Sequence, residues 1–168
     1  MSKPEIRVYQ IQQAAFSFLG NENIITESSD FGAIWGNFFN MGGYNPILPY
    51  ALDTKPINVW YKNASGQNIY FQGLMVCKVD EIPDGYKLVH FPANEFLVIT
   101  TDWMQTSDEA VGENGNGRCN EYAKTVRIPD GYVRDDGPGS PITLIEKENA
   151  DTPDGSRYEV WVPIKKAE

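Results

Sequence analysis

The sequence is poor in the residues on which several classes of protein depend. Its 168 residues include 14 Lys and Arg against 23 Asp and Glu, which gives a formal net charge of −9 at pH 7. A protein that binds nucleic acid needs a basic surface to replace the counterions of the phosphates, and the densest basic run here is Lys165-Lys166. We therefore expect no direct binding of DNA or RNA.

Cysteine and histidine are equally scarce. Cys77 and Cys119 form no CxxC motif and are too few for a disulfide framework, which favours two reduced, buried thiols in a cytoplasmic protein. The single histidine, His90, has no acidic or nucleophilic partner nearby in the sequence and is expected to be structural. Neither cysteine belongs to a metal-binding cluster and no phosphate-binding glycine motif is present, so we expect no metal and no other cofactor.

Long apolar runs are also missing. The N-terminal MSKPEIRVYQ lacks the apolar core of a signal peptide, and glycine, proline and asparagine interrupt the uncharged stretch 31–52. We therefore expect no membrane segment. A length of 168 residues suits one domain, spanning 1–168.

What the sequence does contain is enough apolar material for a packed core. Hydrophobic residues make up 41% of the chain and aromatic residues 12%. Alternating and helical apolar patterns predict strands at 4–20, 57–63, 70–79, 96–101, 142–148 and 157–165, and helices at 31–39 and 117–127. The 31–39 helix is expected to begin after the capping residues Ser28-Ser29-Asp30 and to stop at Gly42-Gly43, and loops are expected at 21–27 and 113–117. The order of these elements indicates an α+β protein.

One short phrase occurs twice. Ile-Pro-Asp-Gly-Tyr stands at 82–86 and again at 128–132, and Pro-Asp-Gly is suited to a turn. Two interpretations remain open at this point. The phrase is either a good turn that recurs by chance, or the trace of a domain built from two similar β-rich halves, each with one helix.

Two stretches near the C-terminus place acidic residues beside aromatic ones. In the last strand, alternation puts Tyr158 on a core face with Val160, and Glu159 on the other face with Trp161. If that second face lines a cavity, Glu159 is a buried anion without a basic neighbour, and a cationic ligand is a suitable partner for it. If the face meets water, Glu159 is an ordinary surface acid.

The preceding strand carries a second pair of acids. Glu146 and Glu148 share one face with Leu144. Next to Glu159 in an antiparallel hairpin they would form a negative patch, whereas on a solvent face they would be two hydrated acids.

At this point the sequence resembles a known family. The ending Tyr158–Lys166, which reads YEVWVPIKK, resembles the closing strand of GyrI-like domains, the effector-binding domains of AraC-type and multidrug-sensing regulators. Other segments of the chain resemble other parts of that family in the same order. They are the 31–39 helix with Trp35, the hairpin segments 57–61 and 73–76, the start of the next strand at 92–96, and Ile145-Glu146. Ile145 replaces the usual aromatic residue, and Glu148 stands where tyrosine is common.

The resemblance implies an α+β fold of two pseudo-repeated halves of antiparallel strands, with one helix each, enclosing a central ligand cleft. It implies a stand-alone effector-binding domain without a DNA-binding domain, and a role related to transcription regulation. The ligand would be a small, amphipathic and cationic aromatic compound. The candidate ligand-binding residues are Glu159, Trp161, Glu146, Trp60, Tyr61, Trp35, Tyr158 and Glu148. Glu159 is the first choice of anchor and Glu146 the second.

Two other functions are compatible with the same residues. Some GyrI-like proteins are hydrolases of reactive small molecules, in which a glutamate would position or deprotonate water. The acid excess would also suit an inhibitor that docks on a basic protein surface. We expect a binding domain rather than an enzyme, as a monomer or homodimer, with a regulator or another protein as a further partner.

Overall fold

The structure is a computed structural model that describes residues 3–168. Within these residues nine strands form one antiparallel sheet, accompanied by three α-helices and two short helical turns. The strands are β1 (Ile6–Gln13), β2 (Phe16–Ile25), β3 (Ile57–Lys62), β4 (Asn68–Val76), β5 (Lys87–Phe91), β6 (Asn94–Thr101), β7 (Tyr132–Arg134), β8 (Leu144–Thr152) and β9 (Gly155–Lys166). The helices are α1 (Phe31–Asn40), α2 (Ser107–Val111) and α3 (Arg118–Ala123), with a 3-10 turn η1 (Leu48–Tyr50) and a π-helical turn η2 (Glu113–Gly117). The predicted α+β class is confirmed.

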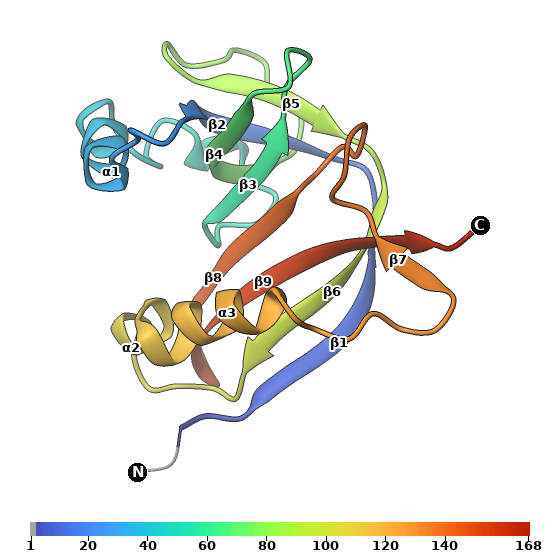
Figure 1. The fold of residues 1–168 in the computed structure, drawn as a ribbon. Helices are drawn as coiled ribbons and strands as arrows, with labels where there is room; N and C mark the ends of the chain where they lie inside the picture. The colour runs from blue at the N-terminus through green and yellow to red at the C-terminus, as the bar shows by residue number, and fades with distance from the viewer. Residues whose placement is uncertain (1–2) are drawn as a thin grey trace.

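The sheet consists of two halves with the same topology. Its strand order is β1-β6-β9-β8-β3-β4-β2-β5, and β7 pairs with β9. One half runs β2–α1–β3–β4, and the other runs β6, the helical segment α2–η2–α3, then β8 and β9. The halves join where β3 pairs with β8, so the predicted two-half arrangement is present (Figure 1).

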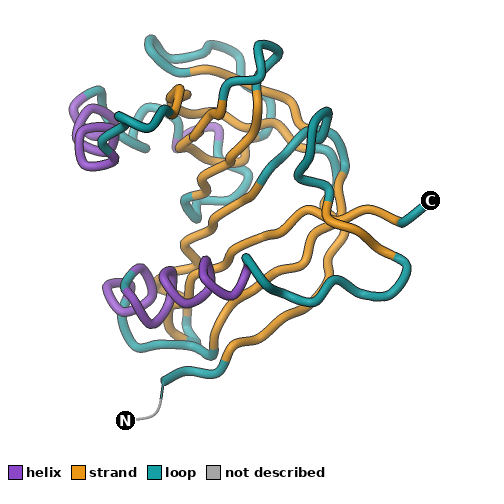
Figure 2. Tube along the Cα trace, in the orientation of Figure 1, coloured by secondary structure: helices purple, strands orange, loops and turns teal. Residues whose placement is uncertain are grey.

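The helical segments of both halves cover the same face of this sheet. Leu74, Gln72, Asn58, Glu146 and Val160 share this face, because cross-strand partners point the same way and alternate residues of a strand do too. At one end of it, α1 packs on β2 and β4 in one apolar cluster, and at the other α3 packs on β6 and β9 in a second. Figure 2 shows α1 well separated from the helical segment α2–η2–α3.

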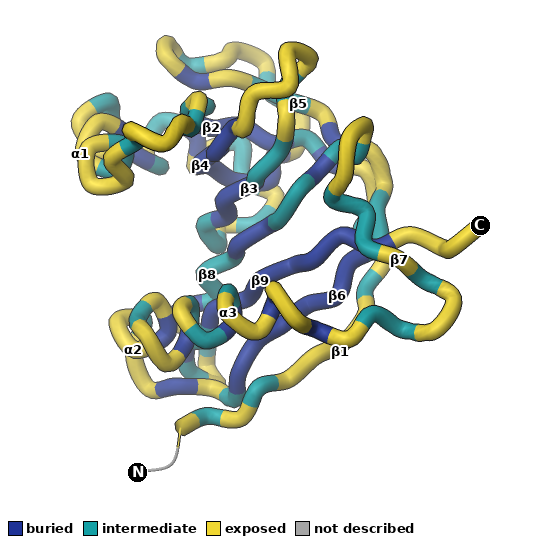
Figure 3. Tube along the Cα trace, viewed as in Figure 1, coloured by how far each residue is buried: buried dark blue, intermediate teal, exposed yellow. Residues whose placement is uncertain are grey.

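The opposite face of the sheet has its own core. The curled sheet closes over a third apolar cluster that includes Phe18, Phe71, Phe96 and Trp161. The central strands are therefore buried on both faces, as Figure 3 shows for most of β6 and β9. A sheet with two buried faces can hold polar side chains away from water on either side, which bears on the acids of β8 and β9.

The repeated Ile-Pro-Asp-Gly-Tyr phrase forms the same turn twice. In each copy the tyrosine N–H donates to the proline carbonyl, at 3.1 Å, and the glycine has a positive φ of 84° or 86°. The first copy follows β4, whereas the second follows α3 and precedes the β8–β9 hairpin. The copies occupy different places in the two halves, so the phrase reflects turn chemistry rather than the duplication that the topology shows.

The prediction of a loop at 21–27 was wrong for its first five residues. β2 continues through Gly20 to Ile25, and Gly20 pairs directly with Gly73 of β4. A Cβ atom on Gly20 would lie 1.9 Å from the Gln72 carbonyl oxygen. Gly20 therefore marks a very close approach of two strands, not the end of one.

Other predictions needed smaller corrections. The stretch 113–117, expected as a loop, is the π-helical turn η2 between α2 and α3, and α2, β5 and β7 were not predicted. Helix α1 begins as expected, with the Asp30 side chain accepting from the Ala33 N–H. Its apolar stripe is not fully buried, however, because Phe31 and Phe39 remain exposed.

The two cysteines also differ from expectation. Cys119 is buried against the helix face of the sheet, and burial raises the pKa of its thiol to about 11. Cys77, which follows the last residue of β4, is exposed, so the prediction of two buried thiols was wrong for this residue. Within residues 3–168 no helix is long and apolar enough to span a membrane.

Candidate functional site

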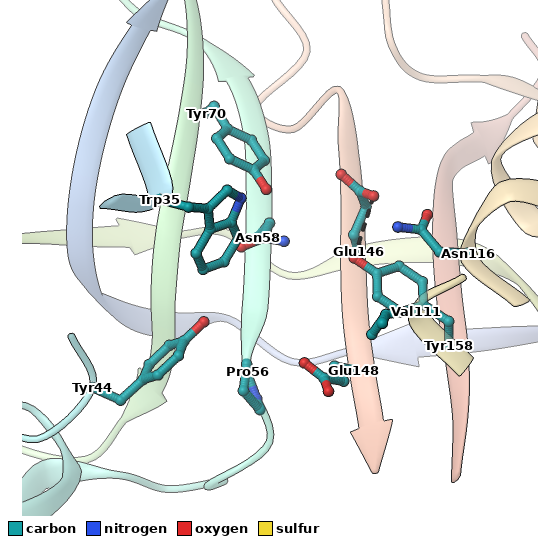
Figure 4. Close-up of a pocket in the computed structure, with 10 residues that line it drawn as sticks. All are labelled: Trp35, Tyr44, Pro56, Asn58, Tyr70, Val111, Asn116, Glu146, Glu148 and Tyr158. Atoms are coloured by element: carbon teal, nitrogen blue, oxygen red, sulfur yellow. Dashed lines mark hydrogen bonds between the residues drawn. The ribbon is translucent and has the colours of Figure 1, made fainter. Parts of the chain in front are cut away.

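A cavity of about 240 Å³ lies on the helix face of the sheet, between the two helical segments (Figure 4). Its lining comes from both halves of the molecule and is rich in aromatic and acidic side chains. The residues are Trp35, Tyr44, Pro56, Asn58, Tyr70, Val111, Asn116, Glu146, Glu148 and Tyr158. The lining contains two carboxylates and no Lys, Arg or His, so the cavity is suited to a cation rather than an anion.

Strand alternation explains why both acids of β8 reach this cavity. Glu146 and Glu148 are two residues apart and therefore point to the same face, as the sequence predicted. Across the junction between the halves, Asn58 of β3 is the direct partner of Glu146. The floor of the cavity is therefore formed where β3 of one half pairs with β8 of the other.

Glu146 is a buried anion held by neutral donors. Its residue is 9% exposed, and its carboxylate accepts from Trp60 Nε1 at 2.7 Å, Asn120 Nδ2 at 3.3 Å and the Tyr158 hydroxyl at 3.4 Å. Within residues 3–168 it forms no ion pair. These hydrogen bonds stabilise the carboxylate and fix its orientation, but they leave its charge uncompensated.

Glu148 is the second acid of the cavity and lies two residues after Glu146 in β8. Burial raises the pKa of its carboxyl group, the nearby Asp151 and Asp108 raise it further, and Lys55 opposes them. This acid holds its proton to a higher pH than an ordinary glutamate. The charge of Glu148 therefore responds to pH above the range of an ordinary glutamate.

Three tyrosines complete the walls of the cavity. Burial raises the pKa of Tyr44, Tyr70 and Tyr158 well above the usual range, and the glutamates add to the effect, Glu148 on Tyr44 and Glu146 on the other two. All three phenols therefore keep their protons at neutral pH. They offer ring faces and neutral hydroxyl groups to a ligand.

Aromatic contacts tie these walls together. The Tyr70 ring lies 4.6 Å from that of Trp60 and 6.4 Å from that of Trp35, measured between ring centroids. Trp60 is not part of the lining, but its indole N–H donates to Glu146 and its ring packs against that of Tyr70. Of the predicted residues, Trp35, Tyr158, Glu146 and Glu148 line the cavity together.

The structure places the first-choice anchor, Glu159, elsewhere. Residues 158 and 160 point to the helix face, so Glu159 and Trp161 point to the opposite face, where Trp161 joins the third core cluster. Glu159 is 5% exposed and accepts from Trp161 Nε1 at 2.9 Å and Asn149 Nδ2 at 3.2 Å. It does not extend the acidic patch of Glu146 and Glu148, and neither Glu159 nor Trp161 lines this cavity.

Tyr61 is also on the opposite face from the cavity. It follows Trp60 in β3, so alternation turns its ring toward Phe71 and Phe91. Its hydroxyl donates to Glu22 at 2.5 Å. Its place in the structure is explained by packing in the third core cluster.

Several lining residues were missed by the sequence reasoning. These are Tyr44, Pro56, Asn58, Tyr70, Val111 and Asn116. Asn58 did carry a signal, because it is a polar residue between Ile57 and Val59 on the same strand face as Trp60. Asn116 carried none, since it belongs to the segment 113–117 that was predicted to be a loop, and Val111 lies in a stretch for which no helix or strand was predicted. Within residues 3–168, no group of three or more His, Cys, Asp or Glu side chains could hold a metal ion.

Comparison with known proteins places this geometry in context. No protein-family model and no curated protein sequence matches the chain. Solved structures do match: SAV2435 bound to tetraphenylphosphonium has a TM-score of 0.68 at 12% identity, covering 96% of this chain and 94% of that one. A Staphylococcus aureus MU50 protein assigned to bacterial transcription regulation has a TM-score of 0.62 at 12% identity, covering 96% and 99%.

A third match is the C-terminal domain of EcmrR, with a TM-score of 0.56 at 10% identity over 96% of this chain and 99% of that domain. At these identities the matches establish the shared fold. The resemblance to GyrI-like effector-binding domains that the sequence predicted is thus confirmed at the level of the fold.

Proposed function

We propose that this protein binds small aromatic cations in the cavity between its halves, with Glu146 as the electrostatic anchor. The observation that carries the proposal is the buried Glu146 carboxylate, which accepts hydrogen bonds from three neutral donors but has no cationic partner within residues 3–168. A bound cation would supply the missing countercharge beside this buried carboxylate.

The surroundings of Glu146 suit an aromatic cation in particular. Trp35, Tyr70 and Tyr158 present rings around the cavity, and a cation near such a ring gains about 0.5–2 kcal/mol. The fold is shared with SAV2435, which was solved with the aromatic cation tetraphenylphosphonium, and with a Staphylococcus aureus protein assigned to bacterial transcription regulation. We infer an effector-binding role, in which the chain detects a cationic compound for a regulatory partner.

A pair of ligands that differ only in charge tests this function. Phenyltrimethylammonium and tert-butylbenzene have nearly the same shape, but the first carries a permanent positive charge. We expect calorimetry and thermal-shift assays to show binding of the cation, and weaker binding of the neutral compound by at least about tenfold. Equal binding of the two compounds would refute an electrostatic anchor.

The proposal also predicts a pH dependence. The raised pKa of Glu148 means that this acid is neutral at low pH and becomes ionised as the pH rises through that value. A cation favours the ionised form, so its affinity should increase, by up to roughly tenfold, as the pH rises above the range in which an ordinary glutamate ionises. Calorimetry in two buffers of different ionisation enthalpy should also detect proton release on binding.

Glu148→Gln provides the control for this prediction. With no titrating group at position 148, most of the rise in affinity and the proton release should disappear. A pH dependence that is unchanged in Glu148→Gln would assign the titration to another group.

A further inference from the structure

We infer that the cavity prefers compact aromatic cations that carry N–H donors, such as an aryl amidinium, over quaternary cations that have none. The inference rests on the proposed function and concerns the chemistry of the ligand. It comes from one side chain that the charge argument does not use, Asn58.

Asn58 presents a buried acceptor with no partner. Its residue is 7% exposed, it lines the cavity, and its Oδ1 atom has no hydrogen-bond partner within residues 3–168. Figure 4 shows its amide nitrogen on the side of Glu146, its direct partner in the β3–β8 pairing, so Oδ1 accepts from a ligand once the amide turns about its Cβ–Cγ bond. A buried acceptor of this kind is costly unless something donates to it.

The Glu146 carboxylate beside it also has room for a donor. A carboxylate has about four lone-pair sites, and Trp60, Asn120 and Tyr158 occupy three of them. A ligand that bears two N–H groups on one planar head can therefore donate to Glu146 and to Asn58 together. A quaternary cation satisfies the charge of Glu146 but leaves the Asn58 oxygen unpaired. That difference corresponds to roughly ten- to hundredfold in affinity.

The size of the cavity points in the same direction. Its volume of about 240 Å³ is below the range of roughly 300–1,000 Å³ that is usual for drug-sized ligands. A single aromatic ring with a small charged head fits this space better than tetraphenylphosphonium, which has four rings and no N–H group. We therefore expect the ligand preference of this protein to differ from the compound bound to SAV2435.

One arrangement inside the protein competes with this interpretation. Gln72 is the cross-strand partner of Asn58 on β4. Its Oε1 accepts from Asn21 and Asn23, and its Nε2 atom is also buried without a hydrogen-bond partner among the described residues 3–168. A small rotation could bring the two amides together. In that case Asn58 would stabilise the sheet and would not recognise the ligand.

The test compares two cations of similar size in three proteins. Benzamidinium carries N–H donors and phenyltrimethylammonium carries none, and both are titrated by calorimetry into the wild type, Asn58→Leu and Glu146→Gln. In the wild type we expect benzamidinium to bind at least about tenfold more tightly. In Asn58→Leu this ratio should fall close to one, mainly because benzamidinium weakens, and in Glu146→Gln both cations should weaken.

The other outcomes are distinct. Equal affinities in the wild type, or a preference that survives in Asn58→Leu, would overturn the inference and leave the proposed function intact. Weaker binding of both cations by the same factor in Asn58→Leu, with a lower melting temperature, would assign Asn58 to the amide pair with Gln72 and also overturn it. Failure of both cations to bind the wild type would overturn the proposed function itself. The wild-type ratio remains decisive if Asn58→Leu does not fold, and Asn58→Ser then serves as the second variant.

Discussion

Glu146→Gln is expected to weaken the binding of an aromatic cation by about ten- to hundredfold and, at the same time, to make the unliganded protein more stable by about 1 kcal/mol. Glutamine has the shape of glutamate and keeps an oxygen for the Trp60 N–H. It removes the charge that no group within residues 3–168 neutralises. Loss of affinity together with a gain in stability distinguishes a binding residue from one that merely supports the fold.

Glu159→Gln is the matched control for this experiment. Glu159 is another buried acid of the same hairpin, at 5% exposure against 9% for Glu146, but it lies on the opposite face of the sheet. Its substitution changes the net charge by the same amount and should leave cation affinity unchanged. If Glu159→Gln abolished binding and Glu146→Gln did not, the ligand would have to lie on the other face.

The second large effect concerns the fold that carries the site. Gly20→Ala is expected to lower the free energy of unfolding by roughly 2–4 kcal/mol. The new methyl group would lie 1.9 Å from the Gln72 carbonyl oxygen and 2.8 Å from the Gly73 Cα atom. Both are backbone atoms of the paired strand β4, so no side chain can move aside to relieve the clash. Urea unfolding followed by circular dichroism measures the loss as a lower midpoint with an unchanged slope.

A glycine in helix α1 provides the comparison. A Cβ atom on Gly36 would meet nothing within 4 Å, and alanine is the better helix former. Gly36→Ala should therefore be neutral or stabilise the protein by up to about 1 kcal/mol. If Gly20→Ala were equally harmless, the close approach of β2 and β4 would not constrain the sequence.

Much of the fold could be predicted because each signal was local. The Asp30 cap, the Gly42-Gly43 stop and the alternation in β8 depend on neighbouring residues, and all three are seen in the structure. Gly20 was misread because its reason is a contact with β4, more than 50 residues away along the chain. A glycine that ends a strand and a glycine that permits two paired strands to approach closely look alike in the sequence.

The site was predicted in part for a similar reason. Alternation correctly grouped Glu146 with Glu148 and Glu159 with Trp161. It could not tell which group meets the cavity, because both faces of the central strands are buried and either could hold an acid. The choice depends on the helices covering one face, and on the arrival of Tyr44, Val111 and Asn116 from irregular segments.

The junction between β3 and β8 has a consequence for how the effect of ligand binding is transmitted through the protein. The two halves of the sheet are paired there over four residue positions, and one of these pairs is Asn58 with Glu146. A ligand that bonds to both side chains would act as a cross-link between the halves, so that part of its binding free energy would appear as resistance to their separation or rotation. A small molecule with the right donors would in this way make the junction in the middle of the protein more rigid, and a molecule without them would not.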